Sequence, residues 1–264
     1  MSHAATHSWV GRRAVPGVAS DPVATTRPAL HGAETTPLVH GARASRSTIT
    51  LKLLMAASGV VFIGFVLAHM YGNLKAFSGQ AAFNEYAEHL RLFGEPMLPR
   101  GGLLWILRVG LIAALVVHVS SAVLLWRRAG KARSQRYAVR RYTHSTLSSR
   151  TMRWGGLTIL VFLVWHLLNF TIVKVNPAGG PTNDPYELLV DTFDLWWMTL
   201  IYLLAMVALG MHLHHGLWSA AQTLGLTNNA RARRNFKIGG ILLAVVVAGG
   251  FSLVPIFVLA GVIS

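Results

Sequence analysis

Three histidines stand within four consecutive positions of an otherwise apolar stretch, LGMHLHHGLWSAAQTLG at residues 209–225. A neutral imidazole is a common metal ligand and one of the few protein groups that bind haem iron. On a helix, His212 and His215 lie about 60° apart on one face, whereas His214 points roughly the opposite way. The stretch therefore indicates metal or haem chemistry with His212 or His215 as a ligand, and helical periodicity favours neither of the two.

Three further histidines also lie in apolar stretches: His69, His118 and His166. A polar group at membrane depth is costly, and such a residue usually has a function. A single histidine is explained equally well by a hydrogen bond to a neighbouring helix. At least one histidine in each of four stretches is much harder to explain by packing, so the set indicates a shared binding role.

The elements that carry these histidines are long apolar segments. Hydrophobic residues make up 53% of the 264 residues and charged residues only 12%, which is about half of the charged fraction of a typical soluble domain. We therefore predict an all-α membrane protein whose five transmembrane helices form a bundle. Segments that reach the length of about 20 residues needed to cross a bilayer lie near 51–75, 102–126, 154–174, 195–222 and 238–262.

Charged residues are distributed unequally between the connecting loops. The loop 127–150 holds eight Lys and Arg residues and no acid, and the loop 225–237 holds four and no acid. The segment 174–194 holds one base and four acids. The positive-inside rule therefore predicts that the N-terminus and both basic loops are cytoplasmic and that the C-terminus is outside. Because the basic residues flank the spans, the net charge of +15 indicates membrane topology rather than nucleic-acid binding.

The first 47 residues differ from the rest of the chain. They are rich in Ala, Ser, Thr, Pro and Arg and contain no sustained apolar run, whereas a secretory signal needs an apolar core of about 7–15 residues. We predict that residues 1–47 form an extension that is disordered or becomes ordered on a partner, and that residues 48–264 form the transmembrane domain.

Helix geometry sorts the membrane histidines by depth. At 1.5 Å per residue, His69 lies roughly 27 Å into the first span and His166 roughly 20 Å into the third, both measured from the cytoplasm. The second and fourth spans run the other way, so His118 (roughly 24 Å in) and His212 (roughly 27 Å in) lie toward the cytoplasm. The expected arrangement is one histidine pair in each leaflet.

A six-coordinate b-type haem needs two axial ligands, and two imidazoles that face each other across a bundle can supply them. A covalent c-type site needs the motif CxxCH, and this chain contains no cysteine. Zinc needs three or four ligands at one depth, whereas these histidines lie at two levels and no span contains an acid. The pattern therefore favours a bundle that binds two haems.

The motifs resemble the cytochrome b membrane anchor of succinate dehydrogenase, in its single-chain, five-helix, dihaem form (the b558 family). The resemblance covers roughly residues 50–262. It is carried by AHMYGNLKAFSGQAAFNEYAEHL at the end of the first span, His118 in the second, WHLLNF in the third and HLHHGLWSAAQTLG in the fourth. The family places a histidine four residues before the glycine of a Gly-Leu-aromatic step, which corresponds here to His212 before Gly216. The resemblance therefore favours His212 over His215.

The resemblance implies a function and a set of ligands. His69 and His166 would share the outer haem b, and His118 and His212 the inner one. The chain would be the electron-transfer subunit of a respiratory succinate:quinone oxidoreductase in the bacterial plasma membrane. Its partners would be the flavoprotein, which carries out the succinate oxidation of the tricarboxylic acid cycle, and the iron–sulfur protein, both on the cytoplasmic side.

A second haem is useful only if electrons from the cytoplasmic side must reach an acceptor near the outer face. Polar groups that follow the first span can serve a quinone there: Glu85, Glu88, His89 and Arg91. A carboxylate or imidazole can exchange quinone protons, and arginine can stabilise a reduced oxygen. The alternative is that these charges only solvate an interfacial helix formed by residues 83–98. The resemblance implies that the quinone is menaquinone.

Two other functions compete with this one. The first keeps the dihaem cytochrome but changes its partner to a hydrogenase or a formate dehydrogenase. The second is a haem-free transporter that uses the membrane histidines as a proton relay. A reduced-minus-oxidised absorption spectrum separates the second from both dihaem functions.

Overall fold

A computed structural model of the chain describes residues 47–131, 147–172 and 174–264, and within these ranges it contains helices and no strand. The prediction for residues 1–47 therefore lies outside the described residues, apart from Ser47. The helices are α1 (Thr48–Leu74), η2 (Lys75–Ser78), α2 (Gln80–Leu92), α3 (Gly102–Lys131), α4 (Leu147–Leu167), the π-helical turn η3 (Leu168–Ile172), α5 (Pro185–Asp194), α6 (Trp196–Thr223) and α7 (Ala230–Leu259).

Five of the described helical segments are long and apolar enough to cross a membrane. They are Thr48–Ser78, Gly102–Lys131, Met152–Ile172, Trp196–Thr223 and Ala230–Leu259. Large apolar side chains along them are exposed, among them Leu107, Val161, Leu204 and Val245, as expected where lipid rather than protein covers a helix. The predicted fold class, an all-α multi-pass membrane protein with five spanning helices, is confirmed.

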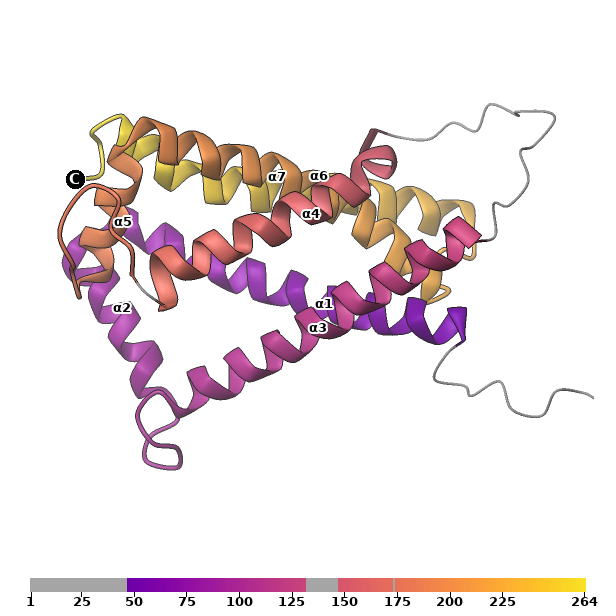
Figure 1. Cartoon of the computed structure of the whole chain (residues 1–264), viewed down its shortest axis with the longest axis horizontal. Coiled ribbons are helices and arrows are strands. Elements are labelled where there is room, and N and C mark those ends of the chain that lie inside the picture. Colours follow the sequence, from indigo (N-terminus) through magenta and orange to yellow (C-terminus); the bar gives the residue numbers. More distant parts are fainter. Residues whose placement is uncertain (1–46, 132–146, 173) are drawn as a thin grey trace, which may run out of the picture. The chain divides into compact units, whose positions relative to one another are not determined.

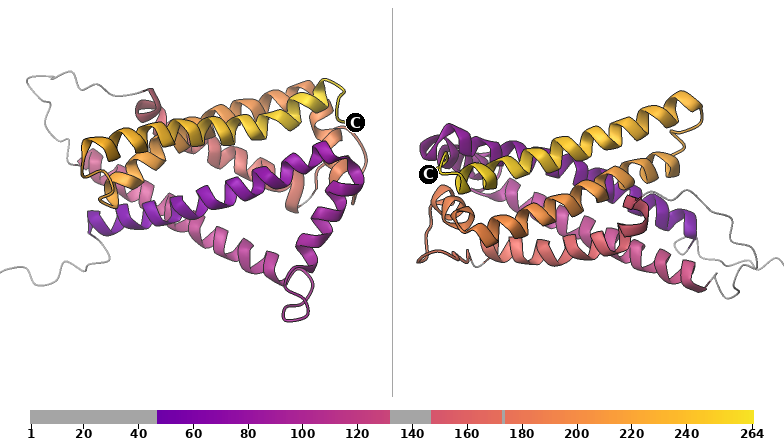
Figure 2. Two further views of the ribbon diagram at one scale, coloured as in Figure 1. Left: turned by 180° about the vertical axis from the view of Figure 1, so that it is seen from behind. Right: turned by 90° about the horizontal axis from the view of Figure 1, so that it is seen from above.

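The five long helices run in alternating directions, and the short helices α2 and α5 lie together at one end (Figures 1 and 2). Every acid among the described residues lies at this end, in 85–95 or 184–194, and we call it the acidic end. The opposite end, where α1 and α7 begin and α3 and α6 finish, is the basic end. Its described cations are Lys52, Arg127, Arg128, Lys131, Arg153, Arg231, Arg233, Arg234 and Lys237.

Aromatic side chains accompany the cations at the basic end. The guanidinium of Arg153 lies 5.4 Å from the ring centre of Trp126, and the ammonium of Lys237 lies 5.3 Å from that of Trp218. Tryptophan beside lysine or arginine is typical of the level at which a helix leaves the hydrocarbon and enters the headgroup region. These pairs therefore mark one membrane boundary of the bundle.

The core of the bundle lies toward the acidic end. Helix α6 packs along α7 and α4, and α1 packs against α3, α6 and α7. The buried cluster joins α5, α6 and the last turns of α7, with Met198 and Val254 almost fully buried and Phe193 and Tyr202 beside them. Gly79, with φ of 85°, makes the turn into α2, a conformation that favours glycine.

Several boundaries differ from the predictions. Helix α3 ends at Lys131, five residues after the predicted span, and α4 begins at Leu147, seven residues before the predicted span. Helix α7 begins at Ala230, eight residues before the predicted span, because Asn229 caps it by accepting a hydrogen bond from the backbone N–H of Ala232 at 2.8 Å. Most of the predicted loop 225–237 is therefore helical. The interfacial helix expected over 83–98 is present as α2 but runs from Gln80 to Leu92, and α5 was not predicted at all.

Candidate functional site

One histidine pair lies toward the acidic end. The ring centres of His69 on α1 and His166 on α4 are 5.7 Å apart, and the ring planes are inclined by 80°. Phe65 stacks on His69 at 5.3 Å, and Phe251 of α7 lies 5.6 Å from the same ring. The two imidazoles are therefore ring neighbours with aromatic side chains packed beside them, and we call them the acidic-end pair.

The second pair lies toward the basic end. The ring centres of His118 on α3 and His212 on α6 are 6.2 Å apart, with the planes inclined by 55°. The Ser58 hydroxyl lies 3.0 Å from Nδ1 of His118. A β-carbon on Gly59 would lie 3.7 Å from Cε1 of His118, and one on Gly156 would lie 3.7 Å from Cε1 of His212. Both glycines therefore lie directly beside the rings of the basic-end pair, at ordinary contact distance.

Neither pair joins two helices that pack closely against each other. In the part of the chain that the structure describes, the close packing of α3 is against α1, and that of α4 is against α6. The His118 and His212 rings meet between α3 and α6, and the His69 and His166 rings between α1 and α4. Separated backbones with inward imidazoles are the arrangement that a planar cofactor between two helices requires.

The ring spacing fits a shared metal. A metal–imidazole bond is about 2 Å long and a ring centre lies about 1 Å beyond the bound nitrogen, so two imidazoles on opposite sides of one ion have centres about 6 Å apart. The observed separations are 5.7 and 6.2 Å. The spacing of both pairs and their imidazole donors therefore fit haem iron.

The remaining histidines of α6 lie elsewhere. The backbone and ring of His214 approach Gly240 of α7, where an added β-carbon would lie 3.0 Å from the His214 carbonyl oxygen. His215 is half-buried, and among the ring contacts of the described residues it is His212 that meets His118. No group of three or more His, Cys, Asp or Glu side chains that could hold a metal occurs within the described ranges.

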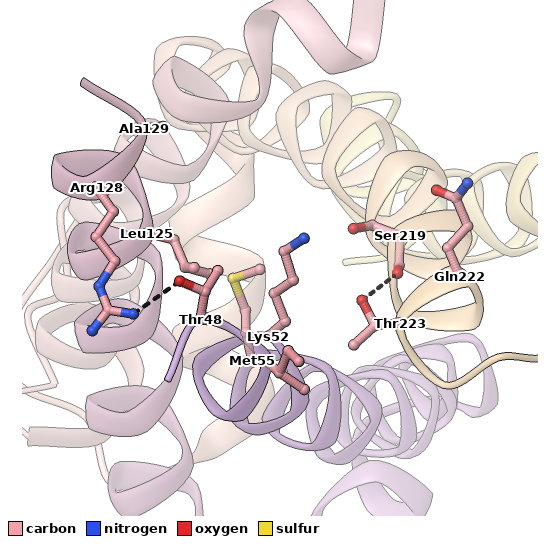
Figure 3. Close-up of a pocket in the computed structure, with 10 residues that line it drawn as sticks. Thr48, Lys52, Met55, Leu125, Arg128, Ala129, Ser219, Gln222 and Thr223 are labelled. Carbon is pink, nitrogen blue, oxygen red and sulfur yellow. Dashed lines mark hydrogen bonds between the residues drawn. The ribbon is translucent and has the colours of Figure 1, made fainter. Parts of the chain in front are cut away.

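A pocket of about 840 Å³ opens at the basic end, between α1, α3 and α6. Figure 3 shows Lys52 reaching from α1 into the space between Arg128 on α3 and Ser219 and Thr223 on α6. The Arg128 guanidinium donates to the Thr48 hydroxyl at 3.0 Å. Among its described lining residues are two cations, three hydroxyl groups and several apolar side chains but no acid, so the polar part of the pocket suits an anionic group.

Two helices carry residues of the pocket and of the basic-end pair on nearly the same faces. Its wall residue Leu125 follows His118 by seven positions, and Ser219 follows His212 by seven. Seven residues are about two helical turns, which return to nearly the same face. The pocket therefore lies on the faces that carry the two imidazoles, roughly 10 Å closer to the basic end.

The four quinone-site candidates lie on α2. Glu88 accepts from Arg91 at 3.1 Å and also forms an ion pair with Arg100. The ring of His89 lies 6.0 Å from that of Phe93. Glu85 is exposed and makes no ion pair within the described residues. The structure thus joins Glu88 and Arg91 in an ion pair, and the ion pairs of the described residues include neither Glu85 nor His89.

Asp184 connects α5 to α2 through hydrogen bonds. Its carboxylate accepts from Gln80 at 2.9 Å and Asn84 at 2.8 Å, and from the backbone N–H groups of Tyr186 at 2.8 Å and Glu187 at 3.1 Å. Partial burial raises the pKa of Asp184, but these hydrogen bonds, that from Asn84 foremost, outweigh burial and hold the pKa below its ordinary value.

Several residues of the site were not predicted from the sequence. The only signal for Lys52 and Arg128 was their position at the ends of apolar spans, which many other cations share. Ser58 carried no signal, because a serine in a membrane helix is usual. The same holds for Asn169 and Tyr202, which lie next to His166 and are described below.

Comparison with protein-family models, with curated proteins and with solved structures found no match for this chain. The resemblance to the succinate dehydrogenase cytochrome b anchor therefore stays a prediction from the motifs quoted above.

Proposed function

We propose that this chain is the dihaem cytochrome b membrane anchor of a bacterial succinate:quinone oxidoreductase. The single observation that carries the proposal is the pair of imidazole pairs, at two levels, with ring centres 5.7 and 6.2 Å apart. His69 and His166 would hold one haem b, and His118 and His212 the other. When bound, the two haems supply one-electron carriers between an iron–sulfur partner and a quinone.

The chain's own residues orient the ligands and exclude water. Phe65, Phe162 and Phe170 flank the acidic-end pair, and apolar walls around a haem restrict solvent. Ser58 orients His118 at the other level. Lys52 and Arg128 would lie opposite the carboxylate groups of the haem held by the basic-end pair, because the pocket that they line follows the same helix faces.

The charge distribution supports an orientation. The described residues of the basic end include cations but no acid. The positive-inside rule assigns such an end to the cytoplasm. The acidic end would face outward, with the C-terminus on that side. The basic end would then dock the iron–sulfur protein and flavoprotein, although residues 132–146 of the basic loop lie outside the described residues.

The acidic end would serve the quinone, which we expect to be menaquinone. Electrons from a cytoplasmic partner reach the basic-end pair first, so the acceptor belongs beyond the acidic-end pair. Glu85 and His89 are the candidates for proton exchange with it. Glu88 is less suited to this role, because its carboxylate is already engaged by Arg91 and Arg100.

The experiment is a haem assay on the purified full-length chain and its variants. We expect about two haem b per chain with low-spin spectra. His118→Ala or His212→Ala should remove one haem, and His69→Ala or His166→Ala the other, because each variant loses an axial ligand. His215→Ala is the matched control and should retain both haems.

A chain without haem would indicate a proton-relay transporter, and co-purification of a hydrogenase or formate dehydrogenase would change the partner.

A further inference from the structure

A buried network of hydrogen-bonded polar side chains is centred on Asn169, three residues after His166. The Asn169 side chain has no exposed surface. Its Nδ2 donates to the Val175 carbonyl at 2.7 Å and to the Thr192 hydroxyl at 3.3 Å, and its Oδ1 accepts from the Tyr202 hydroxyl at 2.8 Å. Thr192 in turn donates to the Leu188 carbonyl at 2.7 Å. The network joins the end of the third span to α5 and α6.

The helix changes its geometry at this network. Residues 168–172 form the π-helical turn that follows His166. A π turn inserts one residue into the helical repeat, and such turns occur most often at functional sites. It alters the faces of the residues after His166 without altering those before it. Asn169 can therefore point into the buried network while His166 still faces His69.

Tyr202 connects the network to the imidazole. Its ring centre lies 6.1 Å from that of His166, with the planes inclined by 63°. Phe162, Phe170 and Phe193 lie around the same tyrosine ring at 4.8, 6.2 and 4.9 Å. The tyrosine ring is therefore held on its sides by aromatic contacts and at its tip by the hydrogen bond to Asn169.

Each pair contains one ring whose Nδ1 has no hydrogen-bond partner, His166 at the acidic end and His212 at the basic end. Within the basic-end pair, Ser58 lies within hydrogen-bond distance of Nδ1 of His118. The torsion that turns an imidazole about its Cβ–Cγ bond has a broad energy profile, so the His166 ring needs another restraint.

We infer that Tyr202 and Asn169 are positioning residues that fix the rotation of the His166 imidazole, and with it the angle between the two rings of the acidic-end pair. The inference rests on the proposed function, because it assigns the network to a haem ligand. A hydrogen-bonded network suits this task, since a fully satisfied buried network specifies one arrangement of its members.

The test uses Tyr202→Phe, which removes the hydroxyl and keeps the ring. The matched control is Tyr186→Phe, because Tyr186 is also buried at the acidic end and donates its hydroxyl to the Ser264 carbonyl at 3.2 Å, away from both pairs. The angle between axial imidazole planes controls the EPR g values of a low-spin ferric haem. The measurement is therefore the EPR spectrum of the oxidised chain, with signals assigned by their loss in His166→Ala and His212→Ala.

We expect Tyr202→Phe to keep two haems per chain and to shift the EPR signal of the acidic-end haem alone. Thr192→Val should shift the same signal, whereas Thr192→Ser, which keeps the hydroxyl, should leave the signal as in the wild type. Tyr186→Phe should leave both signals unchanged. Unchanged signals in folded Tyr202→Phe and Asn169→Ala proteins would overturn the inference, as would equal shifts of both haems in Tyr202→Phe. A wild-type chain that binds no haem would overturn the proposed function as well, so the two failures are distinct.

Discussion

The Ser58 hydroxyl and the His118 imidazole determine together which ring nitrogen of His118 is available to a ligand. The hydroxyl lies 2.8 Å from the Leu54 carbonyl oxygen and 3.1 Å from that of Met55, and 3.0 Å from Nδ1 of His118. A serine hydroxyl has one proton. If one of these carbonyls accepts it, the serine oxygen is placed to accept from Nδ1–H of His118. In that tautomer Nε2 keeps its lone pair, as a metal ligand requires.

Loss of this hydroxyl should weaken haem binding at the basic end. We expect Ser58→Ala to lower retention of that haem by about tenfold, the lower end of the effect of removing a partner of a metal-bound histidine. Spectroscopic haem titration of the apoprotein measures it. Ser252→Ala is the matched control, because Ser252 also donates to the carbonyl four residues before it, Ala248, but touches no histidine. Equal haem affinity in both variants would contradict the assigned orientation.

The Asp184 carboxylate should make the attachment of α5 to α2 sensitive to acid. Its pKa is lower in the folded chain than in the unfolded one, so its stabilisation is present above the unfolded pKa and is lost as the pH falls through the folded value. We expect Asp184→Asn to be less stable than the wild type at pH 7, and the two to converge below about pH 4. Thermal unfolding in detergent measures this.

The control for that comparison is Asp194→Asn, at the exposed end of α5. It should match the wild type at both pH values. Asp184→Ala should lose about 1–2 kcal/mol at neutral pH, since it removes the N-cap of α5 and the acceptor of two amide side chains. A stability difference between the wild type and Asp184→Asn that persists unchanged at pH 3 would show that the charge is not what matters.

Hydropathy and charge predicted the spanning helices well, because lipid imposes a length and a composition on each of them. Depth then predicted which imidazoles meet: antiparallel helices with a fixed rise per residue leave few pairings, and the rings of His69 and His166 do lie together. Their role as haem ligands stays a prediction. The missed helix α5 had a local signature, Asp184-Pro185-Tyr186-Glu187, which combines an N-cap, a proline at the first position and a glutamate at the third.

Other features depend on contacts between distant segments and have no local signature. The π-helical turn after His166 accompanies two hydrogen bonds of Asn169, one that it donates to Thr192 on α5 and one that it accepts from Tyr202 on α6. The choice of Ser58 as the partner of His118 depends on how α1 packs against α3. The early start of α7 depends on the Asn229 cap, which extends the helix beyond the apolar segment that hydropathy detects.

If the basic-end pair holds a haem, the cations of the basic-end pocket should raise its reduction potential. Removing positive charge near a haem favours its oxidised, more positive form, so Lys52→Ala combined with Arg128→Ala should lower the reduction potential of that haem. A redox titration followed by absorbance measures it, with the acidic-end haem as an internal reference. Lys237→Ala removes a cation from the same end outside the pocket, where it lies over Trp218, and should change neither potential. A decrease for both haems would refute a local effect.

The carboxylates of α2 should differ in their effect on quinone turnover. Glu88 is held in ion pairs with Arg91 and Arg100, so its charge stabilises the connection from α2 to α3. Glu85 lies one turn earlier, exposed and outside these ion pairs.

If the quinone reacts at the acidic end, Glu85→Gln or His89→Ala removes a group that can exchange protons with the quinone. We expect a fall of about 100-fold in the rate of succinate-driven menaquinone reduction by the assembled complex, with both haems retained. Glu88→Gln should instead lower thermal stability and change the rate much less. Equal rates in wild type, Glu85→Gln and His89→Ala would move the quinone site away from α2.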